Sequence, residues 1–237
     1  MFKPGKLPKD FLFEYENQTA DEYNLETRGG AIINGLHFKT IKPKGVVLYL
    51  KGNSKSIKGW GKFALDFMCS GYDVIMVDYR RFGKSTGKRS QKALKRDLQY
   101  VYDKIREQVS EEYIILYGRS LGSGFATKLA YLNRPKMLVL DAPYYSFSKV
   151  TGRYIPFIPL SLFLRYPIPT YKWLKYVKCP VHIIHGTNDR IVPYESGKLL
   201  SAQVSPSQVD FIIIPNGKHN DLRSFEQYQT SIAKIFK

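Results

Sequence analysis

The chain has 237 residues, of which 43% are hydrophobic and 24% charged, and its formal net charge is +17. Length and composition of this kind are typical of one globular α/β domain with a sizeable core, and they exclude a disordered or repetitive chain. We expect a single domain over residues 1–237, with a basic surface that attracts anions.

The cysteine content and the N-terminal sequence indicate the cellular compartment of the protein. The two cysteines, Cys69 and Cys179, are too few for a disulfide framework, which favours a reducing environment. The N-terminus contains no apolar stretch of the signal-peptide kind. The longest apolar segment, 154–164, is too short to cross a bilayer and is interrupted by two prolines. We therefore expect a cytoplasmic protein.

The hydrophobic pattern predicts strands that come to alternate with helices. Gly29 and Gly30 favour a hairpin turn between the first two strands. Short apolar strands separated by amphipathic helices are typical of a mainly parallel sheet that is covered on both faces. The expected strands are 23–28, 32–40, 46–50, 74–78, 113–117, 137–140, 181–184 and 209–214, and the expected helices are 91–108, 121–132, 195–203 and 221–236.

Residues 144–176 break this alternation, because they are rich in Tyr, Phe, Leu and Pro and show no clean period. They fall between two core strands, where a small cap over an active site would be inserted. The segment is either a lid or acyl-binding wall, or a loop that packs an irregular helix on the core. The first interpretation favours apolar substrates. It makes Tyr144, Tyr145 and Phe147 candidate substrate-binding residues, together with Ser54.

The most informative motif is Gly-Arg-Ser-Leu-Gly at 118–122, which follows an apolar strand and opens a predicted helix. A serine at the tip of such a turn projects from the backbone, and the flanking glycines relieve the crowding of the bend. The helix that follows directs N–H groups and the positive end of its dipole at the same place. Ser120 is therefore the expected nucleophile.

A serine hydroxyl needs a base, and that base needs a carboxylate to orient it. His219 lies in a loop after the strand 209–214, which is where open α/β sheets place their sites. Asp189 follows the strand 181–184, and Asp141 is the competing acid. The order Ser120, Asp189, His219 is the order of the α/β-hydrolase triad. His185 is expected to be structural or to lie at the rim of the site.

Ester hydrolysis also needs hydrogen-bond donors for the oxyanion that develops. One is expected to be the backbone N–H of Leu121, directly after the nucleophile. The other is expected in the loop that follows the strand 46–50, from Asn53, with Ser54 as the alternative. A plain turn is the competing interpretation of this loop.

These motifs resemble the serine-hydrolase branch of the α/β-hydrolase superfamily, and specifically its Bem46-like and ABHD17/ABHD13-like proteins. The resemblance implies an α/β-hydrolase fold with a predominantly parallel eight-stranded sheet, flanking helices and a small inserted cap. It also implies a cofactor-free hydrolase. One departure is Lys51, which stands where that branch usually has a histidine. The matching segments are 51–54, 77–85, 118–122, 154–160, 185–189 and 217–219.

We therefore expect a serine hydrolase that cleaves a carboxylic ester or thioester, preferably with an apolar acyl group, through an acyl-enzyme. A peptidase, an amidase or an acyltransferase would use the same residues, and a non-catalytic binding protein on a hydrolase fold is a further alternative. No metal-ligand spacing is present, and no cofactor is expected. The expected partner is a small-molecule or acylated substrate. The net positive charge is compatible with peripheral contact with an anionic membrane, and no nucleic acid is expected as a partner.

Overall fold

The computed structural model describes residues 5–148 and 167–237. In this part of the chain, eight strands form one sheet in the order β1-β2-β4-β3-β5-β6-β7-β8. β1 and β2 pair antiparallel, as do β2 and β4, and every other pair is parallel. The strands are β1 (Asp21–Glu26), β2 (Ile32–Phe38), β3 (Val46–Leu50), β4 (Asp73–Val77), β5 (Ile114–Arg119), β6 (Met137–Asp141), β7 (Val181–Gly186) and β8 (Val209–Ile214).

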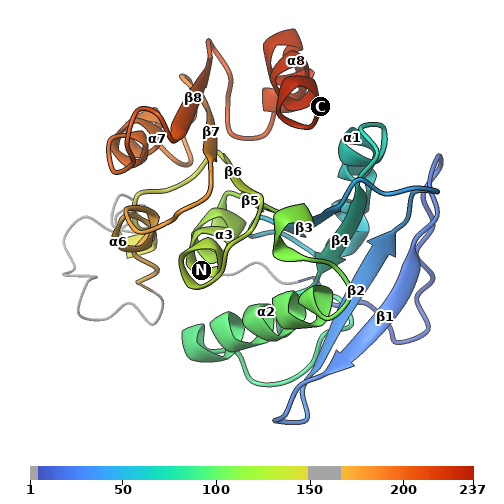
Figure 1. Cartoon of the computed structure of the whole chain (residues 1–237). Coiled ribbons are helices and arrows are strands. Elements are labelled where there is room, and N and C mark those ends of the chain that lie inside the picture. The colour runs from blue at the N-terminus through green and yellow to red at the C-terminus, as the bar shows by residue number, and fades with distance from the viewer. Residues whose placement is uncertain (1–4, 149–166) are drawn as a thin grey trace.

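Helices cover both faces of this sheet (Figure 1). The first face is covered by α2, α3, α6 and α7, whereas α1 and α8 pack on the second. The helices are α1 (Leu65–Met68), α2 (Gln91–Arg106), α3 (Leu121–Leu132), α6 (Thr170–Leu174), α7 (Tyr194–Ser201) and α8 (Glu226–Ile235), with short 3-10 turns at η1 (Ile57–Gly59), η2 (Gly61–Phe63), η3 (Glu111–Tyr113) and η4 (Leu222–Ser224).

Strand alternation divides the core into two layers. Val46 and Leu48 of β3 pack in the cluster under α2 and α3, while Val47 and Tyr49 pack in the cluster under α1 and α8. All residues of β3 are buried, as expected for a central strand with both faces covered. The sheet thereby holds the carboxyl ends of its parallel strands at one rigid edge, where the loops that follow them can meet.

Differences from the sequence prediction include the following two segments. Residues 57–68 form η1, η2 and α1, none of which the apolar pattern predicted. The helix expected over 221–236 is divided, because the backbone of Phe225 is extended (φ −88°, ψ 131°) between η4 and α8. Within the described ranges, no helix is both long and apolar enough to cross a membrane.

Candidate active site

The turn between β5 and α3 carries Ser120 in a conformation that few residues adopt. Its φ of 50° and ψ of −115° lie outside the helical and extended regions. Glycine is required beside it, because a Cβ at Gly122 would collide with the carbonyl oxygen of Leu50, and one at Gly118 would lie 2.6 Å from the Cβ of Ala126. The sequence 118–122 therefore forms the sharp strand-to-helix turn that the motif predicts.

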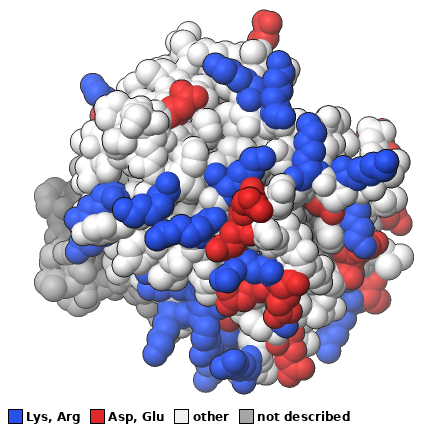
Figure 2. Space-filling view, viewed as in Figure 1, with Lys and Arg blue, Asp and Glu red and all other residues white. Residues whose placement is uncertain are grey.

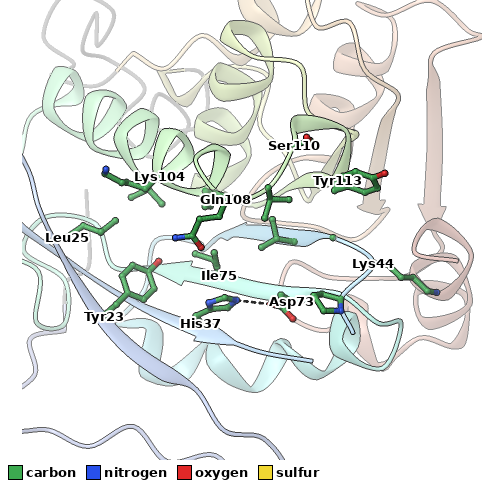
Figure 3. Close-up of a pocket in the computed structure, with 16 residues that line it drawn as sticks. Tyr23, Leu25, His37, Lys44, Asp73, Ile75, Lys104, Gln108, Ser110 and Tyr113 are labelled. Atoms are coloured by element: carbon green, nitrogen blue, oxygen red, sulfur yellow. Dashed lines mark hydrogen bonds and ion pairs between the residues drawn. The ribbon is translucent and has the colours of Figure 1, made fainter. Parts of the chain in front are cut away.

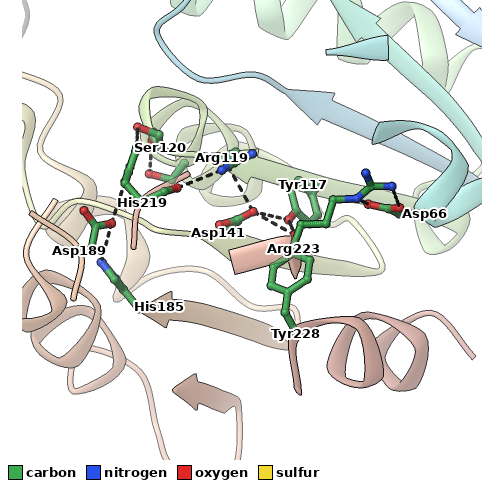
Figure 4. Close-up of polar contacts among 11 residues, drawn as sticks. Asp66, Tyr117, Arg119, Ser120, Asp141, His185, Asp189, His219, Arg223 and Tyr228 are labelled. Atoms are coloured by element: carbon green, nitrogen blue, oxygen red, sulfur yellow. Dashed lines mark hydrogen bonds and ion pairs between the residues drawn. The ribbon is translucent and has the colours of Figure 1, made fainter. Parts of the chain in front are cut away.

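Three side chains from three different loops form a hydrogen-bonded line at this turn (Figure 4). Ser120 Oγ lies 3.0 Å from His219 Nε2, and His219 Nδ1 lies 2.7 Å from Asp189 Oδ2. His219 follows β8 and Asp189 follows β7, so the sheet brings together residues that are 30 and 99 positions apart. The structure thus places the predicted nucleophile, base and acid in contact, and their catalytic roles remain predictions.

The Asp189 carboxylate is held from several sides. Its Oδ1 accepts hydrogen bonds from the backbone N–H groups of Ile191 (2.9 Å) and Val192 (2.8 Å). The buried His185 ring lies 3.5 Å from Oδ2 and 2.9 Å from the carbonyl oxygen of Val192. Burial opposes ionisation, but hydrogen bonds from His185 and His219 outweigh it and hold the pKa of Asp189 well below its usual range. His185 therefore supports the acid, in keeping with its expected structural role.

The loop after β3 lies beside Ser120. A Cβ built at Gly52 would lie 2.9 Å from the ring of Trp60 and in ordinary van der Waals contact, at 3.5 Å, with the Cβ of Ser120, so the loop passes close beside both side chains. Asn53 and Ser54, the predicted oxyanion and substrate residues, follow in this loop and are half-buried. Leu121 is the first residue of α3 and is buried, beside Ser120.

Lys51, which opens this loop, is completely buried. Its ammonium nitrogen lies 3.4 Å from the carbonyl oxygens of both Ser54 and Lys55, and 3.9 Å from the centre of the Phe82 ring. It also lies 3.4 Å from Oδ1 of Asp78, another fully buried side chain. The ammonium group therefore braces the loop from inside, at a position where the resembled branch has histidine.

Burial of the Lys51 and Asp78 charges away from water costs electrostatic free energy. Burial lowers the pKa of Lys51 and raises the pKa of Asp78, and their mutual attraction offsets only part of each change. The Asp78 carboxylate also accepts the backbone N–H of Ile57 at 3.1 Å. The pair thus connects the loop 51–55 with the turn after β4 and with η1. Sequence reasoning missed this pair, because the two residues belong to separate matching segments, 51–54 and 77–85, and neither segment indicates a contact with the other.

A second polar network lies beneath the triad (Figure 4). Asp141, at the end of β6, accepts hydrogen bonds from the hydroxyls of Tyr117 (2.8 Å) and Tyr228 (3.1 Å). Arg119 Nε lies 3.6 Å from the same carboxylate, and Arg119 Nη2 donates to the carbonyl oxygen of His219 at 3.0 Å. Asp141, predicted as the competing acid, therefore anchors Arg119, and Arg119 connects the turn 118–122 with the loop that contains His219.

The predicted cap falls largely on 149–166, which lie outside the described residues. Of the flanking candidates, Tyr144 is 1% exposed and donates its hydroxyl to the carbonyl oxygen of Leu121 at 3.1 Å, so it supports the first turn of α3. Tyr145 stacks on Tyr171 of α6, with ring centroids 4.5 Å apart, and Phe147 packs against Tyr144. Their substrate-binding roles stay predictions.

A cavity of about 560 Å³ lies elsewhere, under the β1–β2 hairpin and the last turns of α2 (Figure 3). His37 lines it and lies 2.9 Å from Asp73, at the amino end of β4. None of the triad residues lines this cavity, so it is not the acyl pocket of the candidate site. Among the described residues, no group of His, Cys, Asp and Glu could hold a metal ion.

Comparison with known proteins gives a family and a fold. Residues 41–175 match the Hydrolase_4 family, which is described as serine aminopeptidase S33. An uncharacterized protein of Mycobacterium tuberculosis is 30% identical over 202 residues, which cover 83% of this chain and 71% of that protein. The lysophosphatidylserine lipase ABHD12 of Xenopus tropicalis is 29% identical over 188 residues, which cover 69% of this chain and only 47% of the lipase.

Among solved structures, the esterase Pf2001 of Pyrococcus furiosus superposes with a TM-score of 0.77 at 18% identity, covering 99% of this chain and 98% of the esterase. At this identity the likeness concerns the fold alone. Together with the mostly parallel eight-stranded sheet, it shows that the predicted α/β-hydrolase fold is correct.

Proposed function

The chain belongs to the Hydrolase_4 family of α/β hydrolases, and on that premise we propose that it is a serine hydrolase that cleaves carboxylic esters or thioesters with apolar acyl groups. The observation that carries the proposal is the hydrogen-bonded line from Ser120 through His219 to Asp189, with the serine on a strained turn. A serine with only a structural role would need neither the hydrogen-bonded line to His219 and Asp189 nor the strained backbone. The finer placement in the Bem46-like branch stays a prediction.

In the proposed reaction, Ser120 Oγ attacks the carbonyl carbon of the substrate while His219 Nε2 takes the hydroxyl proton. The tetrahedral intermediate collapses when His219 returns that proton to the leaving alcohol or thiol, and the acyl group remains on Ser120. Water, deprotonated by His219, then releases the acid. Asp189 holds His219 in the tautomer with hydrogen on Nδ1 and stabilises the imidazolium that forms twice in the cycle.

The oxyanion of the intermediate is proposed to rest between the N–H groups of Leu121 and Asn53. Leu121 opens α3, so its N–H points out of the first turn with the dipole of the helix behind it. A Cβ at Gly52 would reach van der Waals distance of Ser120, so the loop that contains Asn53 passes close to the same turn. Each donor of this kind contributes about 3 kcal/mol to transition-state stabilisation.

Two lines of support favour an apolar ester. The relatives include a lysophosphatidylserine lipase, and the segment 144–176 that follows β6 is rich in Tyr, Phe and Leu. The family description, serine aminopeptidase, makes amide cleavage the second candidate. The same triad serves both reactions, and the leaving group decides between them.

The first test is the hydrolysis of p-nitrophenyl esters of increasing acyl length, beside matched acyl thioesters and p-nitroanilides. We expect ester and thioester turnover above the buffer rate, with an optimum at a medium acyl length. An optimum at the shortest acyl group would contradict the apolar-pocket part of the proposal. Faster cleavage of the anilide than of the matched ester would replace the esterase with the amidase.

A further inference from the structure

Helices α2, α3 and α6 carry a surface on which lysines alternate with aromatic rings. The ammonium groups of Lys95 and Lys128 lie 5.7 and 5.2 Å from the ring centre of Trp173. The contacts continue from Lys128 to the Tyr131 ring (4.3 Å) and from the Tyr131 ring to the Tyr176 ring (6.0 Å). Lys175 then lies 4.8 Å from the ring centre of Tyr176. We call these six residues the basic aromatic face: Lys95, Lys128, Tyr131, Trp173, Lys175 and Tyr176.

The lysines of this face have no acidic partner in the part of the chain that the structure describes. The sequence of 149–166 contains no Asp or Glu, so that segment supplies no carboxylate either. Partial burial lowers the pKa of Lys128, and the positive charge of Lys95 lowers it further. Two like charges are thus held together over one indole ring, and an external anion would relieve their repulsion.

The charge is distributed unevenly along this side of the molecule. Figure 2 shows Lys and Arg side chains gathered over α6 and the first turns of α2, whereas Asp and Glu side chains gather over the last turns of α2. The exposed Lys92 and Lys172 lie on the same two helices and extend the basic face. A cluster of several lysines on neighbouring helices is typical of surfaces that bind acidic phospholipid.

The rings favour a lipid surface over nucleic acid. Binding to single strands needs open ring faces on which bases stack, but two ammonium groups already lie near the Trp173 ring. Tyr176 and Leu132 are 52% and 53% exposed, next to the charges. Exposed tyrosine and leucine beside lysines suit the boundary between headgroups and acyl chains, where aromatic rings accumulate.

We propose that the basic aromatic face docks the protein on a bilayer that contains anionic phospholipid. Lys95, Lys128 and Lys175 would contact the headgroups, and Tyr131 and Tyr176 would enter the interface. The proposal rests on charges and rings outside the triad, so its test does not depend on whether the proposed reaction is correct.

The test is co-sedimentation of the protein with vesicles of phosphatidylcholine alone, or with about 30% phosphatidylserine. The variant Lys95→Glu/Lys128→Glu reverses two charges of the face. The matched control Lys42→Glu/Lys234→Glu reverses two exposed lysines outside it, with the same net charge. We expect wild-type binding only to the anionic vesicles, a loss of about tenfold or more in the first variant, and little change in the control.

The variant Tyr176→Ser keeps every charge and should also weaken binding, because the exposed ring is lost. Equal losses of vesicle binding in the two double variants would show that binding depends only on net charge, and this result would overturn the proposed docking face. Absence of wild-type binding to anionic vesicles at low salt would overturn it as well. Binding of a single-stranded oligonucleotide that depends on Lys95 and Lys128, with no binding to vesicles, would assign the face to nucleic acid instead.

Discussion

Replacing Asp189 with Asn is expected to lower kcat by about 10,000-fold while the fold persists. The amide is nearly isosteric, but it can present an N–H to His219 and thereby favour the tautomer that cannot accept the Ser120 proton. The pKa of Asp189 lies well below its usual range, so the wild-type carboxylate is ionised at every pH above about 4. The loss therefore reflects orientation and charge at His219, measured as kcat on the best ester at neutral pH.

The matched control is Asp210→Asn, which makes the same change at a surface aspartate 3.4 Å from His182. Its side chain is 56% exposed, and its kcat should equal that of the wild type. If Asp189→Asn retained more than about a tenth of the wild-type kcat, Asp189 would not be the acid of the triad. Circular dichroism at the assay temperature checks that both variants are folded.

Replacing Lys51 with Met is expected to lower the free energy of unfolding by about 3–5 kcal/mol, because it leaves the Asp78 carboxylate buried without its cation. Methionine fills much of the same volume, so the loss is electrostatic rather than a cavity effect. The loop also loses its contacts with the carbonyl oxygens of Ser54 and Lys55, and kcat should fall by about tenfold or more. Denaturant unfolding and ester kinetics measure the two effects separately.

The double variant Lys51→Met/Asp78→Asn separates stability from positioning. It leaves no charge at either of these two buried positions, so most of the lost stability should return. The kcat should stay low, because the loop still lacks the contacts that the Lys51 ammonium group makes. Wild-type kcat in the double variant would show that the catalytic position of the loop 51–55 does not depend on Lys51. An unchanged midpoint in Lys51→Met would contradict the ion pair itself.

The central strands and the nucleophile turn could be predicted from sequence because their signals are local. β3 and β8 have the predicted bounds, and Gly118 is required by the turn itself, because a Cβ there would lie 2.7 Å from the carbonyl oxygen of Gly122. Helix α2 could also be predicted from local signals. The hydroxyl of Ser90 accepts the N–H of Ala93 at the start of the helix, and its buried residues recur at helical spacing. Such elements follow from periodicity and capping alone.

Apart from the motif-based grouping of Ser120, Asp189 and His219, contacts between distant residues could not be predicted from the sequence. The sequence separates Arg119 from His219 by 100 positions, and only the sheet order brings the carboxyl ends of β5 and β8 to the same edge. The turns at 57–68 likewise depend on tertiary partners, such as the Asp78 carboxylate that accepts the N–H of Ile57. Local propensity contains no information about such partners, so this part of the site required the structure.

The most direct test of the central claim is covalent labelling with a fluorophosphonate, followed by peptide mass spectrometry. The account predicts one adduct, on the peptide that contains Ser120, and none in the variant Ser120→Ala. Ser207→Ala, which changes an exposed serine far along the chain, should label like the wild type. An absence of labelling in the wild type, or an adduct that persists in Ser120→Ala, would contradict the assignment of Ser120 as the nucleophile.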